Sequence, residues 1–273
     1  MRPRSMDEPR VMARHVRRAV LNMIYRSQTS HIGSAFSCVD LLCVLYGKVL
    51  KVFPGAPESP ERDRFFLSKG HACTALYAVL AEHGFFDASL LDSYAQNGSI
   101  LMSHISSAVP GVEFSTGSLG HALPVALGTA IAAKRRSQAW RTYVLMSDGE
   151  LDEGSNWEAF LFAPSRRLDN LIAVIDKNKF QAMGRTRDIL DNEDLGEKLR
   201  AFGWETWRID GHDLGQIEDA LAAARNSTNG MPKAIIADTV KGKGVSFMED
   251  SIVWHYRAPN KDEYERAAKE LGD

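Results

Sequence analysis

The stretch of sequence that decides the fold runs from residue 142 to residue 178 and reads TYVLMSDGELDEGSNWEAFLFAPSRRLDNLIAVIDKN. Thr142–Met146 and Leu171–Ile175 are short, continuous apolar runs, typical of strands buried on both faces of a parallel sheet. Glu158–Arg166 lies between them and has the pattern of a helix. This order predicts one βαβ unit of an α/β fold.

The alternation of strands and helices continues on both sides of this stretch, with no internal repeat or interdomain linker. It predicts a doubly wound, mostly parallel sheet with helices on both faces, in a single domain covering residues 1–273. The Ala- and Gly-rich segment Gly117–Lys134 is expected to be a buried helix, because small side chains allow close backbone approach. Further strands are expected at Arg64–Leu67, Glu205–Ile209 and Ala234–Thr239. Further helices are expected at Asp7–Gln28, Leu41–Val49, Ala72–His83, Leu214–Ala224 and Asp262–Leu271.

Composition and charge exclude several classes of function. The chain has 273 residues, 44% of them hydrophobic, and a formal net charge of −2. A nucleic-acid partner needs a concentrated basic face, which this balance does not favour. The basic run Lys134–Arg136 is interpreted as a solvated helix end. Ala122–Ala133, the longest apolar stretch, is shorter than the ~20 residues that a membrane span needs.

The cysteines and the start of the chain bear on location. Cys38, Cys43 and Cys73 are odd in number and have no C-x-x-C spacing, which favours reduced thiols over disulfides or a zinc site. Reduced thiols are typical of the cytoplasm. Met1–Arg10 has no apolar core, so no signal peptide is expected there.

Polar side chains follow the two strands of the deciding stretch. Asp148 comes after the first strand and Asn178 after the second, one βαβ crossover later. Because neighbouring parallel strands end at the same edge of a sheet, both side chains are expected there, where α/β sheets bind ligands. Carboxylate and amide oxygens suit Mg²⁺ or Ca²⁺ rather than zinc, and Gly149 allows a phosphate to approach the backbone. Taken singly, Asp148 could instead cap a helix and Asn178 could form a turn.

This pattern resembles a known motif. An acidic residue and glycine, followed some thirty residues later by Asn, is similar to the thiamine diphosphate motif of transketolases, and Trp157-Glu158-Ala159 extends the resemblance. The resemblance implies the diphosphate-binding domain of the thiamine diphosphate-binding fold. It further implies that Asp148, Asn178 and the backbone carbonyl of Phe180 hold Mg²⁺, with Ca²⁺ or Mn²⁺ as substitutes. Gly149, Glu150 and Asn178 are then expected to contact the cofactor.

Four histidines lie in turns rich in Gly or Ser, or beside Trp254, rather than on helix faces: His31, His71, His104 and His255. Such a set indicates a polar pocket that handles protons. The resemblance implies that all four are catalytic and contact substrate hydroxyls, and that His71 and His255 also contact the cofactor. The neighbours of His104 depart from the family pattern, and Tyr256 stands where the family commonly has Gly.

Two further segments resemble cofactor-binding turns of the family. Thr116-Gly117-Ser118-Leu119-Gly120 precedes a helix and is expected to contact the diphosphate through Gly117, Ser118 and Leu119. His121, next to it, replaces a usual Gln. Lys241, in Lys241-Gly242-Lys243-Gly244, is expected to contact the cofactor from a flexible basic loop. The remaining histidines are interpreted as structural, and His212 as part of a loop or helix cap.

The resemblance implies transfer of a two-carbon ketol unit from a ketose or ketose phosphate donor to an aldose acceptor. Full-length transketolases carry two further domains, for pyrimidine binding and at the carboxyl end, and one supplies a glutamate that protonates the aminopyrimidine. Because this chain ends at Asp273, these domains are expected on a partner chain, in an assembly of two plus two. Glu153 is expected near the interface, and the enzyme is expected to be active only as a complex.

Other functions stay open at this point. The partner could make the pair a deoxyxylulose phosphate synthase-like or 2-oxo acid decarboxylating enzyme, although four histidines favour a sugar substrate. His121, Tyr256 and Ile105 depart from the family pattern, so a catalytically dead or regulatory paralogue is a further alternative. A nucleotide-binding module has little support, because no G-x-x-x-x-G-K-[ST] is present.

Overall fold

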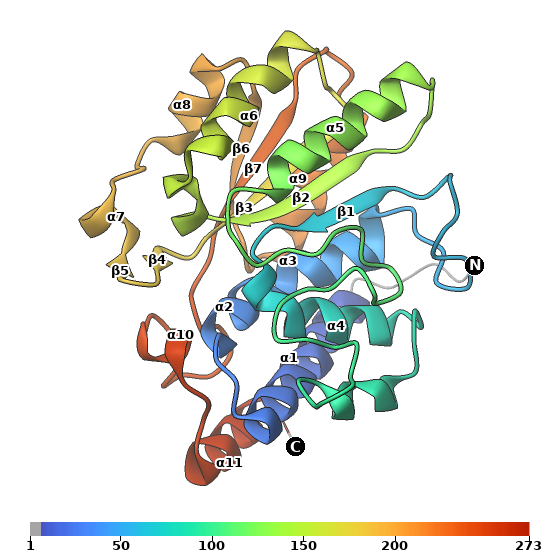
Figure 1. Cartoon of the computed structure of the whole chain (residues 1–273). Helices are drawn as coiled ribbons and strands as arrows, with labels where there is room; N and C mark the ends of the chain where they lie inside the picture. The colour runs from blue at the N-terminus through green and yellow to red at the C-terminus, as the bar shows by residue number, and fades with distance from the viewer. Residues whose placement is uncertain (1–6, 273) are drawn as a thin grey trace.

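A five-stranded parallel sheet forms the centre of the computed structural model, which describes residues 7–272. The strand order is β1-β2-β3-β7-β6 (Figure 1). The predicted doubly wound α/β fold is confirmed, and every pairing in this sheet is parallel. Residues 1–6 lie outside the described residues. They make up most of Met1–Arg10, the segment in which no signal peptide is expected. The strands are β1 (Arg64–Leu67), β2 (Thr142–Ser147), β3 (Leu171–Lys177), β6 (Glu205–Asp210) and β7 (Lys233–Asp238).

Helices cover both faces of the sheet and create two apolar cores (Figure 1). Side chains alternate along each strand, so Val144 packs into one core while Tyr143 and Leu145 pack into the other. Each fully buried side chain of this size contributes about 1.5–3 kcal/mol. One face carries α5 (Ala122–Arg135), α6 (Gly154–Ser165) and α8 (Leu195–Ala201). The other carries α1 (Asp7–Ser27), α2 (Ile32–Ser37), α3 (Val39–Val44), α4 (Cys73–Glu82) and α9 (Leu214–Asn226).

Two expected helices differ from those observed. Helix α5 begins at Ala122 rather than at Gly117, and it is buried on one face only, since Val125 on its outer side is 37% exposed. The expected burial is therefore confirmed for the inner face of the helix only. The second expected helix, Leu41–Val49, is α3 followed by a π-helical turn at Leu45–Val49, and α2 precedes it.

Small elements outside the main sheet complete the fold. An antiparallel hairpin of β4 (Phe180–Gln181) and β5 (Gly184–Arg185) follows β3, and no sequence pattern indicated it. Short helices α7 (Thr186–Ile189) and α10 (Val253–Tyr256) were also missed, and α11 (Lys261–Glu270) closes the described chain. Single 3₁₀ turns lie at Gly70–Ala72, Ala88–Ser93 and Gly149–Asp152.

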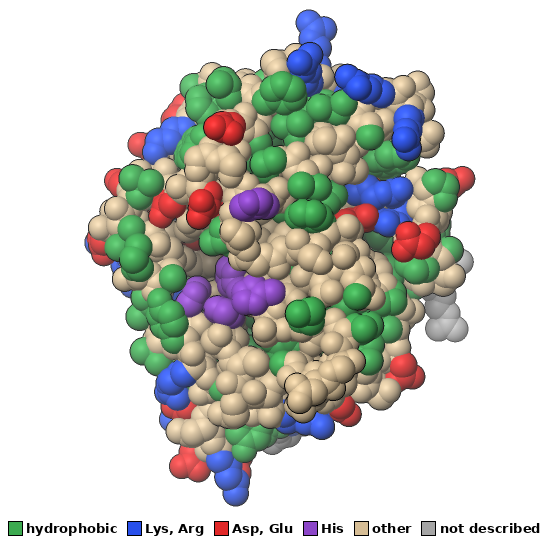
Figure 2. All heavy atoms as spheres, viewed as in Figure 1, with side chains coloured by type: hydrophobic (Ala, Val, Ile, Leu, Met, Phe, Trp, Pro, Cys, Tyr) green, Lys and Arg blue, Asp and Glu red, His purple; other side chains and the backbone are tan. Residues whose placement is uncertain are grey.

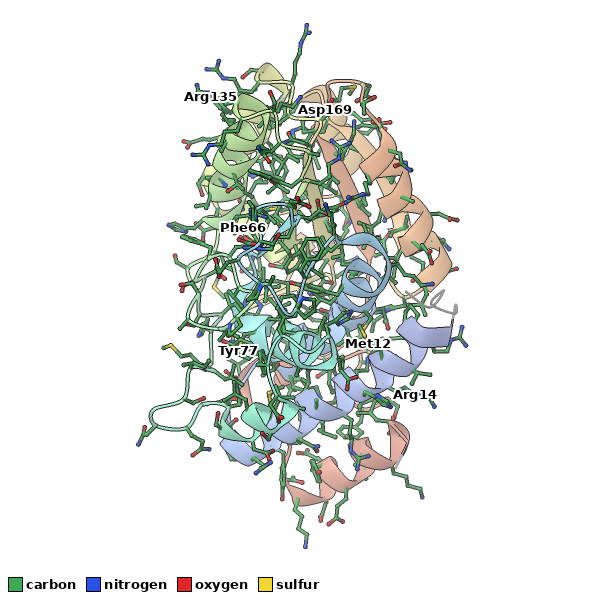
Figure 3. All side chains as sticks on the ribbon, turned by 90° about the vertical axis from the view of Figure 1, so that its right-hand side faces the viewer. Met12, Arg14, Phe66, Tyr77, Arg135 and Asp169 are labelled. Atoms are coloured by element: carbon green, nitrogen blue, oxygen red, sulfur yellow. The ribbon has the colours of Figure 1, made fainter. Side chains whose placement is uncertain are left out.

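The end of the molecule opposite α11 is polar, in contrast to the interior. Figure 3 shows Arg135 and Asp169 at the end of the molecule opposite α11, whereas Phe66 and Tyr77 lie among the packed side chains of the interior. Lys134, Arg135 and Arg136 are all exposed, which confirms the predicted solvated helix end.

Cys38, Cys43 and Cys73 are buried and unpaired. Among residues 7–272, no helix combines the length and apolar character needed to cross a bilayer.

Candidate active site

Asp148 and Asn178 lie at the carboxyl ends of β2 and β3, which pair in parallel so that Ser147 is opposite Asp176. Both side chains are buried, with 4% and 2% of their surface exposed. The Asp148 carboxylate accepts hydrogen bonds from the backbone N–H groups of Gly149 at 3.0 Å and Lys179 at 2.7 Å. The Asn178 amide oxygen accepts one from the N–H of Phe180 at 3.1 Å. The sheet thus brings the two predicted ligands to one edge.

The donors at this edge fit a hard divalent cation. Burial, reinforced by the negative charge of Asp176, raises the pKa of Asp148 to about 7. A bound cation would relieve this cost, because it favours the ionised carboxylate. A Cβ atom at Gly149 would lie 2.6 Å from the Cβ of Gln181 and 3.5 Å from the carbonyl oxygen of Phe180, so only glycine fits beside that carbonyl.

A metal at this edge depends on amide and carbonyl oxygens as well as on the carboxylate. The described residues contain no group of three or more His, Cys, Asp or Glu placed to hold a metal ion. One carboxylate, one amide oxygen and one carbonyl oxygen would form a donor set of the kind that Mg²⁺ accepts when phosphate and water complete its octahedron.

Asp176, the acidic residue of β3, lies next to this edge and connects it to neighbouring segments. It is fully buried and forms an ion pair with the fully buried Lys69. It also accepts hydrogen bonds from the hydroxyls of Ser37, at 2.6 Å, and Thr239. Burial acts to raise the pKa of Asp176, but the charge of Lys69 and the hydrogen bonds from Lys69, Ser37 and Thr239 together outweigh it and hold the pKa below its usual value. Sequence reasoning did not single out this hub, because its members come from four distant segments.

Glu150 is completely buried and does not line the cleft. Its carboxylate accepts hydrogen bonds from the Ser68 hydroxyl, from the N–H of Gly120 at 2.9 Å and from the N–H of Ser147 at 3.3 Å. Burial raises the pKa of this carboxyl group. Gly120 has a φ of +81°, and a Cβ there would lie 2.6 Å from Glu153. Glu150 therefore fixes the 117–120 turn against the end of β2.

Four histidines from four separate segments meet beside this edge. The ring centroid of His31 lies 5.2 Å from that of His71, 5.8 Å from His104 and 5.0 Å from His255. Figure 2 shows histidine side chains gathered in a hollow of the surface. The hollow is a cleft of about 420 Å³ that contains all four rings along its walls. The sequence grouping of these four residues thus corresponds to a spatial cluster.

The backbone holds the cluster together across a long sequence separation. The N–H of His31 donates to the carbonyl of His255 at 3.1 Å, and the N–H of Gly242 donates to the carbonyl of Gly33 at 2.9 Å. His31 itself has a φ of +77°, a left-handed conformation that few residues other than glycine adopt. The position of its ring is therefore set by the surrounding hydrogen bonds rather than by local preference.

The electrostatics of the cluster keep three of the imidazoles, those of His31, His71 and His255, neutral. Burial, with the charge of Lys241 adding to it, lowers the pKa of His255 to about 3. Burial and the neighbouring His104 lower the pKa of His31 to about 4. Burial also holds the pKa of His71 well below its usual value, with Lys69 contributing. Each of these rings therefore offers one N–H donor and one acceptor nitrogen at neutral pH.

Lys241 is buried outside the lining of the cleft and contacts the histidine cluster through His255. Its ammonium group donates to the hydroxyl of Ser34 at 2.9 Å and lies 3.1 Å from Nδ1 of His255. Burial and the nearby charge of Lys69 lower the pKa of Lys241 to about 7. When Lys241 carries its proton, the ammonium group can only donate, so Nδ1 of His255 accepts and Nε2 carries the ring proton.

The predicted residues divide into two groups. Those that line the cleft are His31, His71, His104, His255, Gly117, Leu119, Gly149, Asn178 and Phe180. Those outside its lining are Ser118, Asp148, Glu150 and Lys241. His121 is exposed at the start of α5, where Nδ1 lies 2.8 Å from the carbonyl of Leu119. Lining residues that the sequence interpretation did not assign to the site are Ser34, Ser147, Asp152, Glu153, Gln181, Ala182 and Met183.

Comparison with known proteins places this architecture. Residues 9–273 match the family described as "Transketolase, thiamine diphosphate binding domain". An apulose-4-phosphate transketolase subunit of Actinobacillus succinogenes is 43% identical over 98% of this chain and 98% of that protein. A 6-deoxy-6-sulfo-D-fructose transketolase subunit of Clostridium sp. is 39% identical over 97% of this chain and 98% of its own length.

A solved structure gives the same result. The transketolase of Campylobacter jejuni superposes with a TM-score of 0.92 and 31% identity, over 98% of this chain. This chain spans 43% of that longer protein. The class defined by the fold and the cleft is thus the thiamine diphosphate-binding domain. The chain belongs to the transketolase family.

Proposed function

We propose that the chain is the thiamine diphosphate-binding subunit of a two-chain transketolase. The assembled enzyme transfers a two-carbon ketol unit from a ketose or ketose phosphate to an aldose. The observation that carries this proposal is the meeting, around one cleft, of a buried acid–amide pair at two strand ends with four loop histidines.

The strand-end residues would hold the cofactor through its diphosphate. Asp148, Asn178 and the carbonyl of Phe180 would bind Mg²⁺, for which Ca²⁺ or Mn²⁺ could substitute, and Gly149 leaves the backbone open to phosphate. When bound, thiamine diphosphate supplies the nucleophilic carbon that carries the two-carbon unit. The other residues proposed for cofactor contact or support are Gly117, Ser118, Leu119, Glu150, His71, Lys241 and His255.

The histidines would bind the sugar and transfer protons to and from it. A neutral imidazole can accept a proton from a sugar hydroxyl or donate one to a carbonyl oxygen without first losing or gaining charge. When Lys241 is protonated, Nδ1 of His255 accepts from it and the ring presents its N–H at Nε2. His31, His71 and His104 supply further donors and acceptors along the same wall. A donor rich in hydroxyl groups uses such a wall more fully than pyruvate does, which favours transketolase over 2-oxo acid chemistry.

The assembly with a second chain rests on two observations. The relatives whose names mark them as transketolase subunits match this chain over nearly their whole length, whereas the Campylobacter transketolase extends well beyond it. The cleft is bordered by exposed apolar surface, and Met183, which lines it, is 73% exposed. We propose a pyrimidine-binding chain as the partner, in a cytoplasmic complex of two plus two, with the exposed Glu153 near the interface.

Reconstitution tests the proposal. The chain is purified alone and together with a candidate pyrimidine-binding chain, and both samples are titrated with Mg²⁺ and thiamine diphosphate by calorimetry. Ketol transfer is then followed from xylulose 5-phosphate, apulose 4-phosphate, 6-deoxy-6-sulfofructose and, as the rival donor, pyruvate. We expect cofactor uptake and ketose turnover by the complex only.

Three results would count against parts of the proposal. No cofactor uptake by the complex would reject the thiamine diphosphate site. Full ketol transfer by the chain alone would reject the need for a partner. Turnover of pyruvate in preference to every ketose would assign the complex to a synthase or decarboxylase instead.

A further inference from the structure

We propose that Tyr256 is a specificity-determining residue that closes the outer end of the cleft and limits the length of the sugar chain that fits. This inference rests on the proposed ketol transfer and concerns the substrate side of the same cleft.

The side chain of Tyr256 connects two elements that flank the cleft. It is the last residue of α10, and its hydroxyl donates a hydrogen bond to the backbone carbonyl of Ala182, in the turn between β4 and β5. Its ring packs edge-on against His255, with centroids 5.0 Å apart. Ala182 and His255 both line the main cleft, so the phenol ring links the β4–β5 turn to the histidine cluster beside the cleft. Glycine at this position would leave that span open.

A second, smaller pocket adjoins the cleft at this point. It has a volume of about 250 Å³ and shares His31 and His104 with the main cleft. Tyr256 forms part of its wall. The other lining residues are Gln28, Thr29, Ser30, Tyr94 and Ser103.

The chemistry of the smaller pocket suits uncharged sugar carbons. Hydroxyl and amide groups dominate its wall, and no lysine or arginine is among its lining residues. Such groups exchange hydrogen bonds with sugar hydroxyls but do not neutralise a phosphate. A sugar whose reacting end lies in the main cleft would thus pass His31 and His104 before it reaches Tyr256.

The position of Tyr256 implies a size limit. The side chain is 60% exposed, so removing it costs little core packing, and its bulk forms part of the wall of the smaller pocket. Tyr256→Gly opens the path, whereas Tyr256→Phe keeps the bulk and loses only the hydrogen bond to Ala182. The pair of variants separates steric exclusion from attachment to the β4–β5 hairpin.

The first test is kinetic and uses the assembled complex. The ratio of kcat/KM for the longer, unphosphorylated donor sedoheptulose to that for the shorter, unphosphorylated xylulose is measured in the wild type and both variants. We expect Tyr256→Gly to raise this ratio by about tenfold or more, the size of effect that one pocket contact gives, and Tyr256→Phe to change it much less. An unchanged ratio in Tyr256→Gly would overturn the inference.

A second test needs no turnover and so separates this inference from the proposed function. The assembled complex is treated with diethyl pyrocarbonate, and carbethoxylation of His31 is followed by mass spectrometry, with the exposed His15 as an internal reference. We expect His31 to react several times faster in Tyr256→Gly than in the wild type or Tyr256→Phe. Equal rates in all three proteins would reject the closure, whether or not ketol transfer is observed.

Discussion

The base and the outer end of the cleft are built in different ways. We call Asp148, Asp176 and Asn178, which lie at the strand ends beneath the cleft, the floor. We call His31, His104 and Tyr256 the rim. Floor residues follow or end strands and are at most 4% exposed, and backbone N–H groups or Lys69 satisfy their oxygens. Rim residues come from loops and short helices and are partly or largely exposed. The sheet thus fixes the charged floor, whereas loops, which tolerate variation, supply the rim that would meet the substrate.

The largest expected effect concerns the floor. Asp148→Ala removes the one carboxylate of the proposed metal set, so cofactor uptake by the assembled complex should be lost and ketol transfer should fall at least ~100-fold. Calorimetric titration with Mg²⁺ and thiamine diphosphate checks it. Asp219→Ala, an exposed position of α9 outside the cleft, is the matched control and should change neither quantity. Unchanged activity in Asp148→Ala would favour a catalytically dead chain.

Next in size is the ion pair beneath the floor. Lys69→Met leaves Asp176 buried without its charge partner, which should lower the free energy of unfolding by about 3–5 kcal/mol. Urea unfolding of the purified chain measures this loss. The double variant Lys69→Met/Asp176→Leu removes the uncompensated charge and should recover part of it. A loss below about 1 kcal/mol for Lys69→Met would show that the pair does not set the stability of this edge.

On the rim, His31→Asn should separate catalysis from cofactor binding. Asparagine tolerates the left-handed backbone at this position, so the fold should be retained. Loss of the imidazole should lower kcat by about 100-fold, in the usual range for a group that transfers protons. Cofactor affinity, read by the same titration as for Asp148→Ala, should stay within a few-fold of the wild type. A large loss of cofactor affinity would instead indicate that His31 contributes to cofactor binding, as the floor residues are proposed to do.

The smallest expected effect, counted per pH unit, is on the free energy of unfolding and comes from Lys241, the buried lysine beside His255. Its pKa is about 7 in the folded chain, against about 10.4 when unfolded, so the unfolded chain binds the proton more tightly between these values. The free energy of unfolding should therefore rise with pH from about 7 to about 10, by at most about 1.4 kcal/mol for each pH unit. Lys241→Met should remove this slope, and urea unfolding across that pH range measures it. Equal slopes in both proteins would contradict the depressed pKa.

Two floor residues, Asp148 and Asn178, were accessible to sequence reasoning because their place follows from topology, whereas Asp176 was not singled out. Once Thr142–Met146 and Leu171–Ile175 are identified as neighbouring parallel strands, Asp148 and Asn178 must lie at the same edge. The structure extends those strands to Ser147 and Lys177 without changing this result. The parallel sheet and its order of helices followed from the same periodic signals.

Long-range contacts account for what the sequence did not reveal. The β4–β5 hairpin consists of two-residue strands, which are too short to carry a periodic pattern. Helix α5 begins later than expected because Glu150 holds the N–H of Gly120 in a turn with positive φ. Glu150 was assigned to the cofactor from its place in the motif, yet its partners include Ser68, far away in sequence. Such tertiary contacts are invisible to local propensity.

The two backbone hydrogen bonds that join His31 to His255 and Gly33 to Gly242 have a consequence for engineering. They make the beginning and the end of the chain a single structural unit, so a circular permutant or an inserted tag must leave both segments intact. The exposed loop at residues 136–139 lies beyond Arg135, at the opposite end of the molecule (Figure 3). New termini or a fluorescent reporter placed there would interrupt neither segment.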